Sequence, residues 1–192
     1  MGAAGDCWQD FEVAVGRWRL GNLELEMLPG AALEALSAGC DTPSLVRLAV
    51  MEGASWSEVE PVLRRVFDER GRPLPSREEA VALVADDLLR RLVAEELDPR
   101  GATEKLRRLA WVVVNGPAWP DLEAFVALSD SWEAADAGHL DREAVREAVM
   151  QSGREILARG GVRDHAPADQ RDALAAPVLP RARARPCTAT AR

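Results

Sequence analysis

Residues 76–93 read SREEAVALVADDLLRRLV, and this stretch decides the fold class. Its apolar residues recur at steps of three and four, which places them on one face of an α-helix. Ser76 and Glu79 have the spacing of a capping box, in which each side chain satisfies a free backbone N–H of the first turn. We therefore predict an amphipathic helix whose buried face carries Val81, Val84, Ala85, Leu88, Leu89, Leu92 and Val93.

The same spacing continues toward the N-terminus. A helix that ends before Gly21 turns Trp8, Phe11, Val15 and Trp18 inward, and a short helix from near Pro29 to Gly39 turns Leu33 and Leu36 inward. Asp41 or Thr42 caps a third helix that begins with Pro43, since proline has no N–H to leave unsatisfied there. Ser57 and Glu60 predict a further capping box at the start of a fourth helix.

Helical signals also follow the central stretch. Asp98 and Pro99 start a helix in which we assign Trp111 to the core, Pro120 starts another, and Asp141 caps the last. No segment alternates with the period of two that a half-buried strand requires. The fold class is therefore all-α, an irregular multi-helix bundle or short helical array of about seven or eight helices.

The composition divides the chain into two parts. Residues 1–159 contain the helical signals, and we expect them to form one helical domain. Residues 160–192 are rich in proline, alanine and arginine and have few large apolar side chains. Such a segment cannot bury enough surface to offset its ordering entropy, so we predict a disordered tail.

Charge and cysteine usage limit the class of protein. The net charge is −8, and the tail has six arginines against three aspartates, which leaves −11 for residues 1–159. The longest apolar run, 109–114, is far shorter than the roughly 20 residues that cross a bilayer. No secretory pattern opens the chain, and Cys7, Cys40 and Cys187 are odd in number and scattered, so we expect reduced thiols, a cytoplasmic protein and no membrane partner.

The adjacent carboxylates Asp86 and Asp87 are the strongest candidates for metal or acid/base chemistry. Arg90 and Arg91 follow four residues later, so exposed ion pairs are the simpler interpretation. His139 and His165 have no Cys, Asp or Glu at zinc-ligand spacing, and no glycine-rich phosphate loop occurs. We expect no cofactor and no metal, and we assign no catalytic residue; a metal-dependent enzyme built around Asp86, Asp87 and Glu104 is the alternative.

A partner surface is the other candidate site. Trp56 and Trp119 lie at predicted helix starts, where we expect them half exposed, and tryptophan is enriched at the centres of protein interfaces. In the stretch GCDTPSLVRLAVMEG, residues 39–53, we expect Leu45 and Leu48 to be buried, which leaves Ser44 and Arg47 for binding. The tail motif PRARARP, residues 180–186, has too few arginines for tight nucleic-acid binding beside an acidic body.

Three stretches carry a resemblance: LEALSAGCDTPSLVRLAV (33–50), LPSREEA (74–80) and LDPRGATEKLRRLAW (97–111). In series they resemble a group of small, acidic, all-helical bacterial proteins without an established activity, over roughly residues 20–130 of this chain; Val50 and Met51 depart from the pattern. Proteins of this kind often look like immunity or partner-binding proteins, so the resemblance implies a binding role.

Together these observations predict a helical interaction module that uses an acidic surface to bind a basic protein partner. Charge of one sign steers association with a partner of the other sign. The alternatives are the metal enzyme at Asp86 and Asp87, and a nucleic-acid-associated regulator that uses the arginine-rich tail.

Overall fold

The structure, a computed structural model, describes residues 7–112 and 119–162. Its helices are α1 (Cys7–Arg19), α2 (Leu28–Ser37), α3 (Pro43–Ala49), α4 (Trp56–Glu69), α5 (Arg77–Val93), α6 (Pro99–Val112), α7 (Pro120–Asp136) and α8 (Arg142–Ala158), with a 3-10 helix, η1 (Leu25–Met27), before α2. The described residues contain no strand, which confirms the all-α class. Among them, no helix is both long and apolar enough to cross a membrane. Most of the predicted disordered tail lies outside the described residues.

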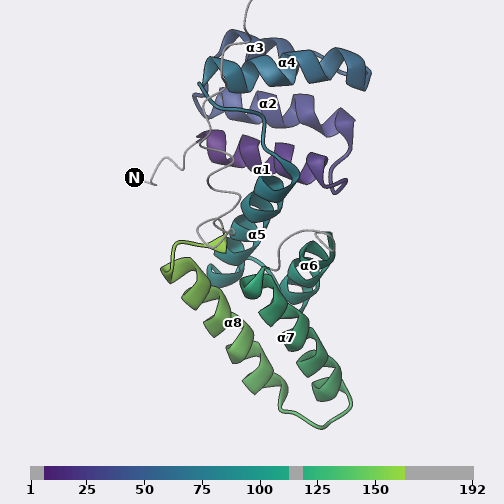
Figure 1. Ribbon diagram of the computed structural model, residues 1–192, viewed down its shortest axis with the longest axis vertical. Coiled ribbons are helices and arrows are strands. Elements are labelled where there is room, and N and C mark those ends of the chain that lie inside the picture. Colours follow the sequence, from purple (N-terminus) through teal and green to yellow (C-terminus); the bar gives the residue numbers. More distant parts are fainter. Residues whose placement is uncertain (1–6, 113–118, 163–192) are drawn as a thin grey trace, which may run out of the picture.

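The N-terminal half is a stack of helices (Figure 1). α1 packs against α2, α2 against α3, and α3 against α4. Each helix contributes apolar side chains to one core, which includes Phe11, Val15, Leu28, Ala32, Leu45, Leu48, Val59, Leu63, Val66 and Phe67. The amphipathic pattern of the sequence thus closes this half around a core of its own.

The C-terminal half is built on α5. This helix packs against α1, α6 and α8, and α7 packs against α6 and α8. Figure 1 shows α5 running from the level of α1 down into the group formed by α6, α7 and α8. The predicted inward face of α5 is confirmed except at Val93, which is half-buried; the other side chains join the second core with Leu106, Leu109, Leu122, Phe125, Val149 and Ile156. The stretch that decides the fold class is also the helix that both halves share.

A close crossing joins the two halves where α1 meets α5. A Cβ atom on Gly16 would lie 3.3 Å from Val84 Cγ2 and 3.4 Å from the carbonyl oxygen of Ala80, so glycine lets the two backbones approach. Arg17, the next residue, donates to Asp87 Oδ2 at 2.6 Å. The close packing at Gly16 and the ion pair beside it therefore hold the two halves together.

The helix starts agree with most of the sequence-based caps. Leu45 N donates to Thr42 Oγ1 at 3.3 Å, which identifies Thr42 as the cap of α3. Glu79 N donates to Ser76 Oγ at 3.1 Å, so the capping box of α5 is confirmed. The box predicted at Ser57 and Glu60 is wrong. Two overlapping S-x-x-E patterns occur in this stretch, and the structure uses the earlier one, Ser55 and Glu58, so that α4 begins at Trp56.

Two large apolar residues that we predicted to be buried are exposed in the structure. Leu33 is 58% exposed and Trp111 is 59% exposed. Each stands five residues after a buried leucine, Leu28 and Leu106, which is about 140° around the helix from that leucine. Both predictions fail because the side chain is apolar but lies off the apolar stripe. Ala32 and Ala35 fill the core side of α2 instead.

Cys7 and Cys40 form a disulfide, with 5.9 Å between their Cα atoms. The prediction of reduced thiols is therefore wrong for this pair. The bond ties the start of α1 to the residue just before the α3 cap loop, and Cys40 is buried in the N-terminal core. The sequence spacing of 33 residues contains no signal for the pairing, since it is the stacking of α1 on α2 that brings the two sulfurs together. Cys187 lies outside the described residues.

Candidate functional site

Exposed apolar side chains concentrate on one part of the N-terminal half. Of the six large apolar residues that are exposed in the described part of the chain, four lie on or next to η1, α2 and α3: Met27, Leu33, Val46 and Val50. Val46 and Val50 are four residues apart and share one face of α3. Val50 is the most exposed of all, at 77%. We give the name α2–α3 surface to the exposed side chains of η1, α2 and α3 and of the residues that adjoin them.

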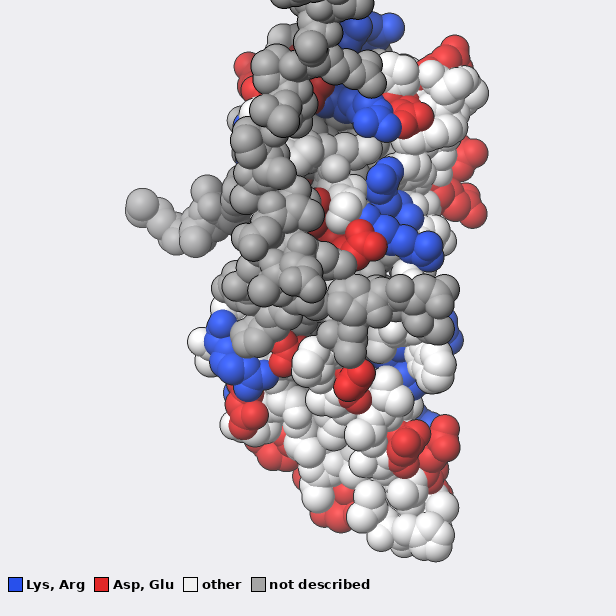
Figure 2. All heavy atoms as spheres, in the orientation of Figure 1, with Lys and Arg blue, Asp and Glu red and all other residues white. Residues whose placement is uncertain are grey.

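This surface is also acidic. Between residues 20 and 46 the sequence has four carboxylates and no lysine or arginine; the carboxylates are Glu24, Glu26, Glu34 and Asp41. All four are exposed, and Glu52 follows just after α3. Figure 2 shows acidic groups along the right-hand edge of the N-terminal half. The α2–α3 surface thus combines apolar side chains with negative charge, a combination that suits a partner with the opposite charge pattern.

Ser44 and Glu69 hold α3 in place beneath this surface. The hydroxyl of Ser44 donates to Glu69 Oε1 at 2.6 Å, and its backbone N–H donates to Glu69 Oε2 at 3.1 Å. The hydrogen bond from the Ser44 hydroxyl lowers the pKa of Glu69 below its ordinary value. Ser44 is 8% exposed, so the structure assigns it a positioning contact between α3 and the end of α4.

Arg47 lies within the α2–α3 surface. It is exposed and makes no hydrogen bond or ion pair with any residue that the structure describes. Arg47 is the only basic residue between positions 20 and 63. Of the residues that we chose from the stretch 39–53, it is the one that the fold leaves available for contact.

The two candidate tryptophans have different environments. Trp56 is half-buried, and the centroid of its ring lies 4.4 Å from that of the Trp18 ring. α1 and the start of α4 therefore touch through an aromatic pair. Trp119 is only 4% exposed and belongs to the C-terminal core, which differs from the half exposure we predicted. Its indole N–H has no acceptor in the described part of the chain. In the described part of the chain, neither tryptophan forms a hydrogen bond or ring contact with Ser44 or Arg47.

Of the two exposed ion pairs that we predicted, Asp86–Arg90 does not form, whereas Asp87 and Arg91 form a long pair on a partly buried carboxylate. Asp86 is 3% exposed, and its Oδ1 accepts the backbone N–H of buried Val162 at 2.7 Å. Asp87 accepts from Arg17 of α1, with Arg91 more distant at 3.9 Å. Asp86 therefore holds the chain after α8, and Asp87 holds α1.

Metal-ligating groups do not gather in the described residues. Nowhere among residues 7–112 and 119–162 do three or more His, Cys, Asp or Glu side chains come together in a way that would hold an ion. Glu104, which we considered with the aspartate pair, binds Arg107 and Arg108 instead. Hydrogen bonds from these two arginines lower the pKa of Glu104 to about 2. His139 is exposed in the α7–α8 connection, and His165 lies outside the described residues.

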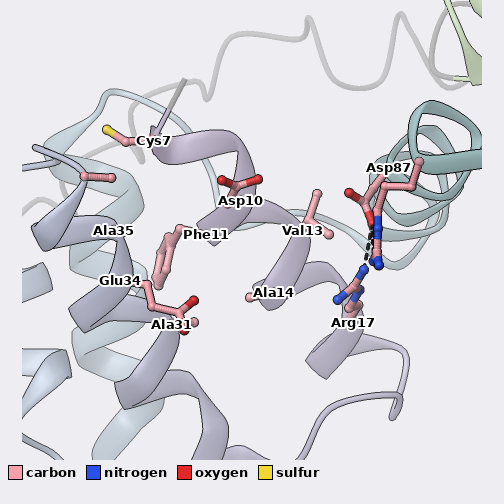
Figure 3. A pocket seen from close by; sticks show the side chains of 12 residues that line it. Cys7, Asp10, Phe11, Val13, Ala14, Arg17, Ala31, Glu34, Ala35 and Asp87 are labelled. Carbon is pink, nitrogen blue, oxygen red and sulfur yellow. Dashed lines mark hydrogen bonds and ion pairs between the residues drawn. The ribbon is translucent and has the colours of Figure 1, made fainter. Parts of the chain in front are cut away.

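A hollow of about 330 Å³ lies between α1, α2 and α5 (Figure 3). Figure 3 shows Arg17 of α1 and Asp87 of α5 pointing toward each other at one end, with Asp10 and Glu34 along the wall. The opposite end reaches Cys7 of the disulfide. Acidic and basic groups both line it, so its field favours no single charge.

Sequence reasoning missed Met27, Val46 and Val50 as surface residues. Val46 follows Leu45, and Val50 follows Ala49, so each lies one position beyond the apolar stripe of α3. A helical wheel drawn on Leu45 and Leu48 contains this signal, because it places Val46 and Val50 outside the buried arc. Met27 had no such signal, since η1 is a single short turn.

We compared the chain with family models, curated proteins and solved structures, and none of the three comparisons finds a match.

Proposed function

We propose that this protein is a non-enzymatic interaction module that binds a basic protein partner through the α2–α3 surface. The observation that carries the proposal is the coincidence, on the α2–α3 surface, of four exposed apolar side chains with four exposed carboxylates and a single cation, Arg47. Apolar residues supply the affinity of such an interface, while the charge around them supplies the rate of encounter and the choice of partner.

The partner should be basic and should present apolar side chains to Val46 and Val50. The charge of −11 on residues 1–159 favours the approach of a cationic protein over the whole body, and the α2–α3 surface offers it an apolar contact. Neutralisation of a cationic toxin is one form of this role, and it agrees with the resemblance of residues 20–130 to small acidic helical proteins.

The cytoplasmic location remains a prediction. The Cys7–Cys40 disulfide argues for an oxidising compartment, since the cytosol keeps thiols reduced. Counting free thiols on protein isolated directly from the native host decides between the two locations. One reactive cysteine per chain indicates the oxidising compartment, and three indicate the cytoplasm.

The proposal is tested by capturing partners from native-host lysate on wild-type protein and then reconstituting the complex from purified components. Two variants address the surface: V46S/V50S removes apolar groups and E34Q/D41N removes two charges. Their matched controls are L140S, which alters an exposed apolar residue between α7 and α8, and E123Q/D130N on α7.

We expect a basic protein whose dissociation constant rises at least about tenfold with V46S/V50S and about threefold or more with E34Q/D41N. The controls should bind as wild type does. Binding should also weaken as salt rises to physiological strength, where the Debye length is about 8 Å. Equal affinity for all four variants, or affinity independent of salt, would overturn the proposal.

A further inference from the structure

A second hollow, of about 360 Å³, opens between the end of α1, α5 and α6. Four cationic side chains line it: Arg17 from α1, Arg91 from α5, and Lys105 and Arg108 from α6. None of its lining residues is acidic. We call it the basic hollow. In a chain of net charge −8, four cations thus gather around a hollow that no carboxylate lines.

Ion pairs outside the lining hold three of these cations in position. Asp87 binds Arg17 at 2.6 Å and Arg91 at 3.9 Å, Glu96 lies 3.6 Å from Arg91, and Glu104 binds Arg108 at 2.8 Å. None of these three carboxylates lines the basic hollow, so they orient the guanidinium groups from outside it. Lys105 is exposed and forms no ion pair with the described residues. Figure 2 shows basic groups on the visible face near the end of α1, beside an acidic group.

The rest of the lining is largely apolar. Val84 and Leu88 come from α5, and Leu109 and Val112 come from α6. Leu88 and Leu109 are buried members of the C-terminal core, so core packing holds this wall in place. Its size falls in the range of roughly 300–1,000 Å³ that is typical of small-molecule pockets. An apolar wall with convergent cations at its rim selects a ligand that has an apolar body and an anionic end.

We propose that the basic hollow binds a small amphipathic anion, an organic phosphate or carboxylate that carries an aliphatic or aromatic body. The anionic group lies among Arg17, Arg91, Lys105 and Arg108, where charge-assisted hydrogen bonds are available. The apolar body covers Val84, Leu88, Leu109 and Val112. This site is distinct from the α2–α3 surface in both position and sign of charge.

The test is titration calorimetry of the full chain with three probes: octyl phosphate, inorganic phosphate and octanol. Octyl phosphate combines the anionic group with the apolar body, and each of the other probes has only one of them. We expect measurable binding of octyl phosphate, with inorganic phosphate and octanol at least about tenfold weaker.

The first variant, K105E/R108E, reverses two exposed cations at the rim and breaks one ion pair, with Glu104. Its matched control is R64E/R65E on α4, which also reverses two exposed cations and breaks one ion pair, with Glu60. Both variants change the net charge by the same amount. We expect octyl phosphate affinity to fall at least about tenfold in K105E/R108E and to stay within about twofold of wild type in R64E/R65E.

A second variant keeps the proposal testable if the charge reversal disturbs folding. V112S shortens the apolar wall and leaves every cation in place, so it should weaken octyl phosphate and leave inorganic phosphate unchanged. E34Q/D41N, which tests the proposed function, should bind octyl phosphate as wild type does. No binding of octyl phosphate to wild type, equal losses in K105E/R108E and R64E/R65E, or equal affinity for octyl and inorganic phosphate would overturn the proposal.

Discussion

Among the described residues of the N-terminal half, Glu12 is the most deeply buried carboxylate that forms an ion pair. It is 4% exposed and accepts from Arg70 at 2.7 Å and from Arg72 at 2.5 Å. The guanidinium of Arg70 also lies 4.1 Å from the centre of the Trp8 ring. One carboxylate thus fixes the loop after α4 against α1. This role could not be predicted from the sequence, because Glu12 follows Phe11 and looks like the solvent-facing neighbour of a core residue.

Replacing Glu12 by glutamine should lower the free energy of unfolding by about 2 kcal/mol, since two arginines lose a buried partner. Urea denaturation followed by circular dichroism measures this change. Glu60→Gln is the control, because Glu60 pairs with Arg64 on an exposed helix face and should cost less than about 0.5 kcal/mol. A loss for Glu12→Gln as small as that for the control would contradict the assigned role.

Glu104 predicts a pH dependence. Arg107 and, second, Arg108 lower its pKa from 4.5 to about 2, so the folded state favours the ionised carboxylate. A depressed folded-state pKa contributes stability above pH 4.5, and that stability is lost as the pH falls toward 2. The side chain is 36% exposed, so screening limits the contribution to less than about 1 kcal/mol.

The measurement compares wild type with Glu104→Gln in urea titrations at several pH values. The variant should be less stable at neutral pH, and the difference should shrink between pH 4.5 and 2. A difference that stays constant over this range would show that the carboxylate charge does not matter.

At the scale of elements, the crossing of α1 over α5 depends on Gly16. Gly16→Leu should lower the free energy of unfolding by at least about 2 kcal/mol, because the new side chain meets Val84 and the backbone of Ala80. Gly30→Leu on α2 is the matched control, since a Cβ there meets nothing within 4 Å and leucine favours a helix more than glycine does. Thermal unfolding of both variants measures the contrast, and equal stability of the two would refute the close crossing.

Helix starts and inward faces were largely predictable from the sequence because caps and periodicity are local. Thr42 and Ser76 lie where their spacing predicts, and most of the inward face of α5 is as expected. The failures have local causes too: two overlapping capping patterns at Ser55 and Ser57, and apolar side chains off the stripe at Leu33 and Trp111.

Contacts between distant helices were not predictable. The Cys7–Cys40 bond and the Arg17–Asp87 pair arise from how helices stack, and no spacing in one sequence encodes that arrangement. The candidate site, too, was predictable only in part. Arg47 was chosen from its stretch, whereas Val46 and Val50 emerged only when the buried side of α3 was known.

At the scale of the whole molecule, the disulfide closes a loop of 33 residues that includes α1 and α2. Chain entropy gives such a link about 3–4 kcal/mol of stability, since it restricts the unfolded state. Adding dithiothreitol should therefore lower the urea midpoint of wild type and leave that of C7S/C40S unchanged. Identical midpoints for wild type with and without reductant would contradict this contribution.

The two cores and the α1–α5 crossing present the α2–α3 surface and the basic hollow at different places on one scaffold. An acidic, apolar surface on the N-terminal stack and a cationic hollow between α1, α5 and α6 suit ligands of opposite charge. Binding at one place should therefore leave the other free.

Hydrogen exchange with and without the purified basic partner tests the central claim most directly. If the α2–α3 surface is the interface, the amides of η1, α2 and α3 gain protection in the complex, while those of α7 and α8 exchange as in the free protein. Protection confined to α6, α7 or α8, with η1, α2 and α3 unchanged, would contradict the account.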